Sequence, residues 1–228
     1  MRKSLPVVGE SIPESRGDPP LYTGNMAEHW HLVARNRQAE KTTGSFSKNQ
    51  KMPCPSWGIS AARCITGSRL AQVSGTVCHP SVCYARKRNY TWDAVQNKLE
   101  ERYNGMWDEI DGVPIWTVAM AFMMNWECDD IMRLFDSGDL QGPNHFKNVI
   151  KIAEAVPHIV IWMPTREITT VQSVTRERIE AGLTGCPLNL RPRISANLID
   201  GQIPKGFTYT SRVVTGEGTC IAQQQGNS

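Results

Sequence analysis

Four cysteines in a short, loop-rich stretch constrain this chain more than any other feature. Cys54, Cys64, Cys78 and Cys83 follow the spacing C-x9-C-x13-C-x4-C within residues 51–90. Glycines and prolines interrupt the same stretch, so we expect no long helix or strand there and a backbone that can wrap around a ligand. Thiolates gathered in this way indicate an iron–sulfur cluster, a zinc ion or disulfides.

The same stretch is basic. Residues 51–90 contain six Lys and Arg residues and no Asp or Glu, whereas the rest of the chain mixes both signs. Neighbouring cations lower the pKa of a thiol and favour the thiolate that binds metal, so we expect lowered thiol pKa values here. The alternative is four unrelated buried cysteines, since a free cysteine also packs as a small hydrophobic residue. The surrounding Gly, Pro and Arg residues favour a metal or cluster.

Length and composition fit one domain in a reducing compartment. The chain has 228 residues and a formal net charge of +3, which by itself does not indicate a nucleic-acid-binding protein. No apolar run approaches the roughly eighteen residues of a membrane span, and the N-terminus lacks the apolar core of a signal peptide. We therefore expect a cytoplasmic location and no membrane partner. In that compartment the seven cysteines favour metal binding or reactivity over disulfides.

Periodicity predicts an α/β domain over residues 41–228, preceded by an N-terminal extension. Residues 1–40 are expected to be partly flexible, because four prolines fall among the first 24 residues. Hydrophobic patterns predict the following elements: helices over 91–104, 114–124, 144–156 and 168–181, and strands over 131–136, 158–163, 189–199 and 207–214. Alternating strands and helices build a parallel sheet. A partial (β/α) barrel is favoured over an open sheet, with the cysteine-rich loop before the first main helix.

Polar residues follow two of the predicted strands. Chemistry in parallel α/β proteins collects at the carboxyl ends of strands, so Asp136, Asp139, Arg166 and Glu167 are our catalytic candidates. Turn chemistry explains an aspartate beside a glycine equally well, and Arg166 and Glu167 could simply pair with neighbours at the rim. His145 is a further candidate general base, although a surface histidine near a helix start is the simpler interpretation.

Aromatic and basic residues alternate at the end of the cysteine-rich stretch. Tyr84, Arg86, Lys87 and Arg88 combine a stacking surface with positive charge, which is typical of contacts to unpaired bases and phosphates. Aromatic residues more often belong to a core. A nucleic acid or nucleotide partner is therefore a hypothesis.

Several short motifs resemble a known family, the gene product 88 proteins of tailed bacteriophages and prophages. The resemblance covers roughly residues 44–222 and implies a phage-encoded protein of the host cell cytoplasm. The matching residues are Asn49, Lys51 to Ser56, Cys64, Gly67 to Leu70, Val77, Cys78, Cys83 to Ala85, Asp136 to Leu140, Trp162 to Glu167 and Arg193 to Ala196. The family's activity is not established, so the resemblance implies no reaction.

A weaker resemblance is to radical S-adenosylmethionine enzymes. These are barrels with a cluster-binding cysteine loop after the first strand and a segment after the second strand that binds the cofactor's amino group. Ser137, Gly138 and Asp139 stand where that segment would, and Cys78 and Cys83 resemble the end of the cysteine loop. The usual C-x3-C-x2-C spacing is absent, and four cysteine ligands would leave no iron open. The alternative is that three of the cysteines hold the cluster and the fourth is structural.

Three hypotheses follow from these observations. The first is an iron–sulfur enzyme that acts on a nucleotide or nucleic acid, with Cys54, Cys64, Cys78 and Cys83 as ligands and S-adenosylmethionine as a possible cofactor. The second is a nucleic-acid-binding module without catalysis in which zinc holds the four thiolates. The third is a protein that binds a host protein, with the cysteines stabilising a loop. Of the remaining cysteines, Cys128 and Cys186 are expected to be buried or incidental, and Cys220 is undecided.

Overall fold

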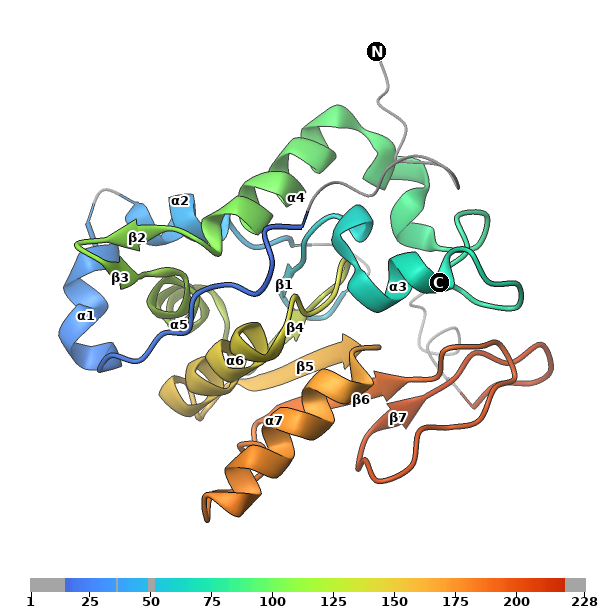
Figure 1. The fold of residues 1–228 in the computed structure, drawn as a ribbon. Coiled ribbons are helices and arrows are strands. Elements are labelled where there is room, and N and C mark those ends of the chain that lie inside the picture. Colours follow the sequence, from blue (N-terminus) through green and yellow to red (C-terminus); the bar gives the residue numbers. More distant parts are fainter. Residues whose placement is uncertain (1–14, 36, 49–51, 220–228) are drawn as a thin grey trace.

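A parallel sheet forms the centre of the molecule. The computed structural model describes residues 15–35, 37–48 and 52–219 (Figure 1). Its main sheet has five strands in the order β1-β4-β5-β6-β7, and every pair is parallel. The strands are β1 (Ser56–Trp57), β4 (Ile131–Leu134), β5 (Val160–Thr165), β6 (Leu190–Ser195) and β7 (Thr210–Ser211). The predicted α/β class and parallel sheet are confirmed.

The order of the strands in the sheet is their order in the chain. The helices are α1 (Met26–Val33), α2 (Gln38–Thr43), α3 (Ile65–Leu70), α4 (Asp93–Gly105), α5 (Trp116–Glu127), α6 (Pro143–Ala155) and α7 (Ile168–Glu180). Crossovers between parallel strands are nearly always right-handed, so successive crossovers in one direction place their helices on one face. Figure 1 shows α6 and α7 together over the same face of β5 and β6. This winding is compatible with the partial barrel that the sequence favours.

Residues of β5 alternate between the two faces of the sheet. Ile161, Met163 and Thr165 are buried, while Trp162 and Pro164 are half-buried. Alternate side chains of a strand point to opposite faces. One face therefore packs into the helix-covered core and the other is left more open.

Helix α6 follows the amphipathic pattern read from the sequence. Phe146, Val149 and Ile150 are at most 1 % exposed. The helix begins at Pro143, where a missing N–H is tolerated. The carboxylate of Asp18 accepts the backbone N–H groups of Asn144 at 2.8 Å and of residue 145 at 3.0 Å, which caps the first turn.

The described part of the N-terminal extension is docked more closely than expected. Tyr22 is 1 % exposed, and its backbone N–H donates to Asn148 Oδ1 at 2.9 Å. The amide of Asn148 in turn donates to the carbonyl of Pro20 at 2.9 Å. Helices α1 and α2 pack against α5, so residues from Asp18 onward belong to the same core; residues 1–14 lie outside the described part.

A hairpin precedes α5 where the sequence analysis expected the start of a helix. Strands β2 (Glu109–Ile110) and β3 (Val113–Pro114) pair antiparallel, and Asp111 and Gly112 between them have φ values of 52° and 75°. Asp-Gly with positive φ at both positions is the favoured two-residue hairpin turn. The helix therefore begins at Trp116 rather than at Pro114.

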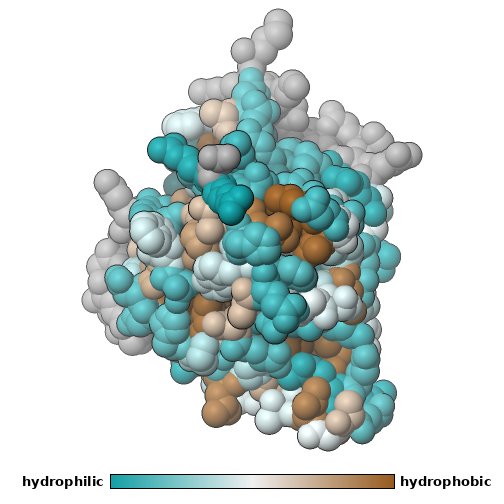
Figure 2. Space-filling view, turned by 90° about the vertical axis from the view of Figure 1, so that its left-hand side faces the viewer, coloured by the Kyte–Doolittle hydropathy of each residue, from teal (hydrophilic) through white to brown (hydrophobic). Residues whose placement is uncertain are grey.

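The end of the molecule that carries α1 and the β2–β3 hairpin is mainly hydrophilic. Figure 2 views this end, where the hydrophobic residues form small separate patches among hydrophilic ones. Within the described residues, none of the helices combines the length and the apolar character needed to cross a membrane.

Candidate functional site

Three of the four clustered cysteines line one cavity. Cys64, Cys78 and Cys83 border a space of about 390 Å³ at the carboxyl ends of β4, β5 and β6. The other polar residues that line it are Tyr84 of the cysteine-rich loop, Arg133 in β4, Ser137 and Asp139 after β4, Thr165 and Arg166 at the end of β5, and Ser195 at the end of β6. The structure therefore brings the cysteine-rich loop and the strand-end motifs to one place, as the parallel topology predicts.

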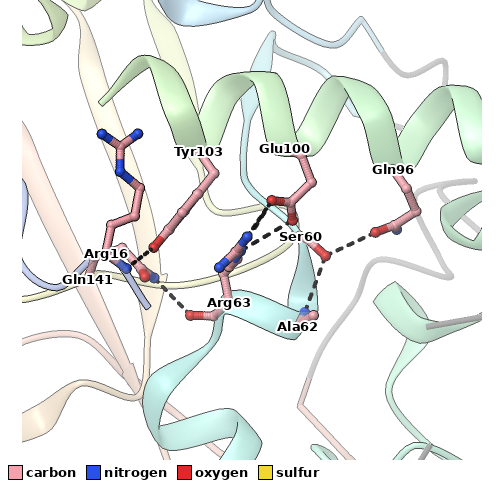
Figure 3. Close-up of polar contacts among 8 residues, drawn as sticks. All are labelled: Arg16, Ser60, Ala62, Arg63, Gln96, Glu100, Tyr103 and Gln141. Carbon is pink, nitrogen blue, oxygen red and sulfur yellow. Dashed lines mark hydrogen bonds and ion pairs between the residues drawn. The ribbon is translucent and has the colours of Figure 1, made fainter. Parts of the chain in front are cut away.

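Contacts to α4 fix the position of Cys64. The preceding residue, Arg63, pairs with Glu100 (Nη2 to Oε2, 2.8 Å), and its guanidinium lies 4.1 Å from the centre of the Tyr103 ring. The side-chain amide of Gln141 donates to the carbonyl of Arg63 at 3.0 Å. Figure 3 shows these contacts on the short 3-10 helix η1 (Ala61–Arg63), directly before Cys64. They hold the Cys64 backbone from two sides.

Gly67 leaves room for two of the sulfur atoms. A Cβ added at Gly67 would lie 3.5 Å from Cys64 Sγ, 3.7 Å from Cys78 Sγ and 2.9 Å from Cys64 Cβ. The last distance is shorter than carbon atoms tolerate without a shift. Both sulfurs therefore approach the helix α3 at a position that only glycine leaves open.

Burial dominates the acidity of these thiols. It raises the pKa of Cys64 well above its usual value, and the nearby Asp139, Cys83 and Cys78 raise that pKa further, while Arg86 lowers it. Burial also raises the pKa of Cys78, against the opposing effect of Arg166. The expectation that basic neighbours leave these two thiols with lowered pKa values is wrong, because desolvation of a thiolate outweighs the attraction of partly solvated cations.

Cys54 lies apart from the other three. It precedes β1, at the amino end of the sheet, and it is not among the residues that line the cavity. Burial raises its pKa, with Arg133 acting in the opposite direction. Burial likewise raises the pKa of Cys128 to about 12, with smaller contributions from Glu127 and Cys54. Cys128 Sγ lies 3.7 Å from Met132 Sδ. Cys54 and Cys128 are both less than 9 % exposed, so they belong to the core.

Asp139 is held rigidly beside the cavity. Its Oδ1 accepts the Thr165 hydroxyl at 2.5 Å and the Leu140 N–H at 2.8 Å, and its Oδ2 accepts the Arg166 N–H at 2.9 Å. Burial, followed by the charge of Glu167, raises the pKa of Asp139 to about 7. This carboxyl group exchanges a proton near neutral pH.

The other two carboxylate candidates have structural contacts. Glu167 accepts the Thr66 N–H at 2.8 Å and the Thr66 hydroxyl at 2.9 Å, which ties the end of β5 to the start of α3. Asp136 accepts the Ser56 hydroxyl at 3.1 Å and is not among the cavity-lining residues. The structure thus separates Asp136 from Asp139 and does not form the carboxylate pair at the cavity.

Several buried polar atoms around the cavity have no hydrogen-bond partner among the described residues. They are Ser137 Oγ, Arg166 Nε and Arg133 Nε. An unsatisfied buried polar atom costs about 1–3 kcal/mol. Such atoms beside a cavity are typical of a ligand site.

Of the four nucleic-acid candidates, Tyr84, Lys87 and Arg88 are exposed and Arg86 is half-buried. The Tyr84 hydroxyl donates to the carbonyl of Asp136, and Arg86 Nη2 donates to the carbonyl of Ala61 at 3.3 Å. Lys87 Nζ donates to a carbonyl of its own loop. Tyr84 lines the cavity, and Arg86 is turned toward the protein.

His145 does not line the cavity. Its side chain is 0 % exposed, its Nδ1 accepts the Gln141 N–H at 3.1 Å, and burial lowers its pKa to about 3. The imidazole is surrounded by the rings of Trp57, Trp116 and Phe135. It is a neutral core residue, so its proposed role as a general base is wrong.

Sequence analysis missed the buried Arg102. This residue of α4 is 3 % exposed, and its guanidinium donates to the carbonyls of Ser45 at 2.7 Å and Gly58 at 3.4 Å. It ties the start of the cysteine-rich segment to α4. No pattern in the sequence distinguishes it from a surface arginine.

The fold and the cavity define a parallel α/β protein with three cysteines at the carboxyl ends of its strands. A family model described as gene product 88 matches residues 30–212, which is most of the chain. The protein belongs to the gene product 88 family, as its motifs predict. No curated protein and no solved structure matches the chain.

Proposed function

We propose that this protein binds an iron–sulfur cluster through Cys64, Cys78 and Cys83. The observation that carries the proposal is that these three thiols line one cavity with the strand-end residues, while Cys54 lies at the other end of the sheet. Three thiolates leave one iron of a four-iron cluster without a protein ligand. This arrangement favours three ligands over four.

The cavity leaves room for a cluster between the thiols. Its volume is about 390 Å³, and Cys64, Cys78 and Cys83 all line it. Ligands of a cluster bind separate irons, so the three thiols need not converge on one point as they do around a single zinc ion. Among the described residues, no three Cys, His, Asp or Glu side chains form a group that could hold one metal ion.

The residues beside the thiols suit an amino-acid-bearing cofactor such as S-adenosylmethionine. When bound, a cluster with an open iron supplies one-electron reduction to such a cofactor. Asp139 offers a carboxylate to its amino group, and Arg166 offers a guanidinium to its carboxylate. Ser137 Oγ and Arg166 Nε are buried without partners among the described residues, so each can form a hydrogen bond with a ligand. We infer an enzyme whose substrate is a nucleotide or nucleic acid.

The zinc alternative has less support. The four-thiolate zinc site that the sequence suggests needs Cys54 close to the other three thiols, and Cys54 instead lies near Cys128. A zinc-stabilised nucleic-acid-binding module or a host-binding module thus requires a different arrangement of the loop.

Metal analysis tests the proposal directly. Protein purified without oxygen should be brown. It should contain iron and acid-labile sulfide and absorb broadly in the visible range. Serine at Cys64, Cys78 or Cys83 should abolish the absorbance. Cys54→Ser, the matched control, should retain it. A colourless, folded protein with one zinc per chain, or a Cys54→Ser variant as pale as Cys78→Ser, would overturn the proposal.

Cofactor binding is a separate test. Equilibrium dialysis with labelled S-adenosylmethionine should show binding to the cluster-loaded protein. Asp139→Asn and Arg166→Gln should each weaken binding by about tenfold or more, since each removes a charge-assisted hydrogen bond. Release of methionine after reduction with dithionite would establish the reaction class. If both variants bind S-adenosylmethionine as tightly as the unchanged protein does, Asp139 and Arg166 do not belong to the cofactor site.

A further inference from the structure

We propose that the open face of the parallel sheet binds the phosphate groups of a single-stranded nucleic acid, through Arg133, Arg191 and Arg193. The inference rests on the proposed function, because it names the substrate of the same cavity. It uses a different set of cations from the basic segment of the cysteine-rich loop.

Strand register places the three arginines on one face. Arg133 of β4 is opposite Trp162 of β5, and Trp162 is opposite Arg191 of β6. Residues opposite each other in adjacent strands point to the same side of a sheet. Arg193 lies two residues beyond Arg191 and therefore shares its face. Strands are about 4.8 Å apart, so Arg133 and Arg191 lie roughly 10 Å apart across the sheet.

This face is the one that helices α6 and α7 leave open. Those helices cover the side to which Met163 and Ile194 point, and both residues are fully buried. Arg191 and Arg193 are exposed, and Trp162 is half-buried. A ligand can reach the guanidinium groups of Arg191 and Arg193 without displacing a helix, while Arg133 is half-buried and borders the cavity.

The three arginines have no carboxylate partners in the described part of the chain. None of the ion pairs found there includes them. Arg193 Nε donates to the carbonyl of Thr210 at 3.3 Å, and Arg133 Nε is buried without a partner among the described residues. Positive charge gathered without compensating carboxylates attracts a polyanion.

Aromatic rings orient two of the guanidinium groups. Arg133 Cζ lies 4.8 Å from the centre of the Trp162 ring, and Arg191 Cζ lies 6.0 Å from the centre of the Tyr209 ring. Arg133 also donates to Met52 Sδ at 3.2 Å and to the Tyr84 hydroxyl at 3.5 Å. Stacking on a ring fixes the guanidinium plane of Arg191 and leaves its edge N–H groups available to an acceptor. Those N–H groups match the oxygen pairs of a phosphate.

The arginine face is continuous with the cavity. Arg133, Pro164 and Ser195 line the cavity and belong to the same strands. Enzymes that act on a base need it unstacked, which a single strand permits most easily. A single-stranded chain can thus lay its phosphates on the arginines and bring one nucleotide to the mouth of the cavity.

Fluorescence anisotropy with the cluster-loaded protein tests this proposal. The probes are a labelled single-stranded DNA oligomer and an oligomer of the same sequence with an uncharged backbone. We expect the charged oligomer to bind more tightly. The double variant Arg191→Gln/Arg193→Gln should lower its affinity by about tenfold or more and reduce the slope of log K against log salt concentration by about 0.7 for each lost phosphate contact.

A charge-matched control is Arg35→Gln/Arg176→Gln, which changes two exposed arginines away from this face. It should bind as the unchanged protein does. Three outcomes would overturn the proposal: equal affinity of both double variants, equal affinity for the charged and uncharged oligomers, or binding of a nucleoside triphosphate without binding of the oligomer.

The visible spectrum separates this inference from the proposed function. The double variant should retain its cluster absorbance and its binding of S-adenosylmethionine. A protein without a cluster that still binds the oligomer through these arginines would overturn the proposed function alone. A cluster-containing protein whose oligomer binding ignores the arginines would overturn this inference alone.

Discussion

The two ends of the parallel sheet use cysteine in different ways. At the amino end, Cys54 and Cys128 are buried in the core, where Cys128 contacts Met132. At the carboxyl end, Cys78 and Cys83 line a cavity with unpartnered polar atoms around it. One end holds its cysteines in the core, and the other places them at a cavity. The position of a cysteine relative to the strands decides whether it packs in the core or lines the cavity, and cysteine spacing alone does not reveal that position.

The largest expected effect concerns the apolar core directly below the cavity, at His145. Its pKa is about 3 in the folded protein and about 6.5 in the unfolded chain, so only the unfolded state gains the proton between these values. The stabilisation is fully present above pH 6.5. It falls by about 1.4 kcal/mol for each pH unit below that. Urea unfolding at pH 7, 6, 5 and 4 measures the slope.

His145→Gln should remove this part of the pH dependence, whatever its effect at pH 7. His158→Gln is the control, because His158 is exposed. If the free energy of unfolding of both variants depends on pH as that of the unchanged protein does, the His145 imidazole does not lie in a dry core. The contrast between core and cavity would then not hold at His145.

A smaller effect is expected at Glu167, which holds the rim by hydrogen bonds rather than by packing. Glu167→Gln keeps one acceptor oxygen and turns an amide toward the donors of Thr66. We expect a loss of about 2 kcal/mol in the free energy of unfolding, in the range of hydrogen bonds to charged groups. The pKa of Asp139 should also fall, since the charge of Glu167 raises it.

Urea unfolding at pH 7 measures the loss, and Glu180→Gln on the exposed end of the same helix provides the control. Equal stability of the two variants would show that the contact to Thr66 does not hold the rim.

Serine substitutions compare the two ends directly. Cys128→Ser places a hydroxyl in the core and should lower the free energy of unfolding by about 1–2 kcal/mol without loss of iron. Cys83→Ser, at a half-buried position, should change stability by less than about 0.5 kcal/mol and abolish the absorbance of the cluster. The contrast between the two ends of the sheet is contradicted if the variant with the lower free energy of unfolding is also the one that loses iron.

The smallest effect on stability is expected at Gly67. Alanine is favoured over glycine within a helix by about 0.5–1 kcal/mol, which offsets the shift that its Cβ imposes on Cys64. Gly67→Ala should therefore change the stability of the cluster-free protein by less than about 1 kcal/mol, yet lower the iron content per chain. Gly216→Ala is the control, because a Cβ there meets no atom within 4 Å. Full iron content in Gly67→Ala would contradict the three-cysteine site.

The sequence predicts the regular elements well because their patterns are local. Apolar spacing identifies α4, α6 and α7 to within a few residues, and buried runs identify β4 and β5. The hairpin at Asp111-Gly112 has a recognisable turn signal that the sequence analysis overlooked. Strand β1 has only two residues and leaves no periodic pattern.

The composition of the site was harder to predict. Strand β1 runs between Cys54 and Cys64, so it carries the first cysteine to one end of the sheet and the second to the other. The spacing of the cysteines in the sequence does not show in which direction the strand between them runs. The buried ring contacts of His145 and the internal bonds of Arg102 likewise depend on tertiary packing, which no short pattern encodes.

The agreement between strand order and chain order also sets the order in which the molecule can assemble. Each strand of the main sheet after β1 pairs with the strand of that sheet that precedes it in the chain, so the sheet can extend as the chain emerges from the ribosome. One contact of the cysteine-rich segment forms late in synthesis, because the carbonyl of Gly75 accepts the N–H of Ile199 at 2.7 Å. This contact forms only after Ile199 has been synthesised, so the final position of the cysteine-rich segment is set late in folding.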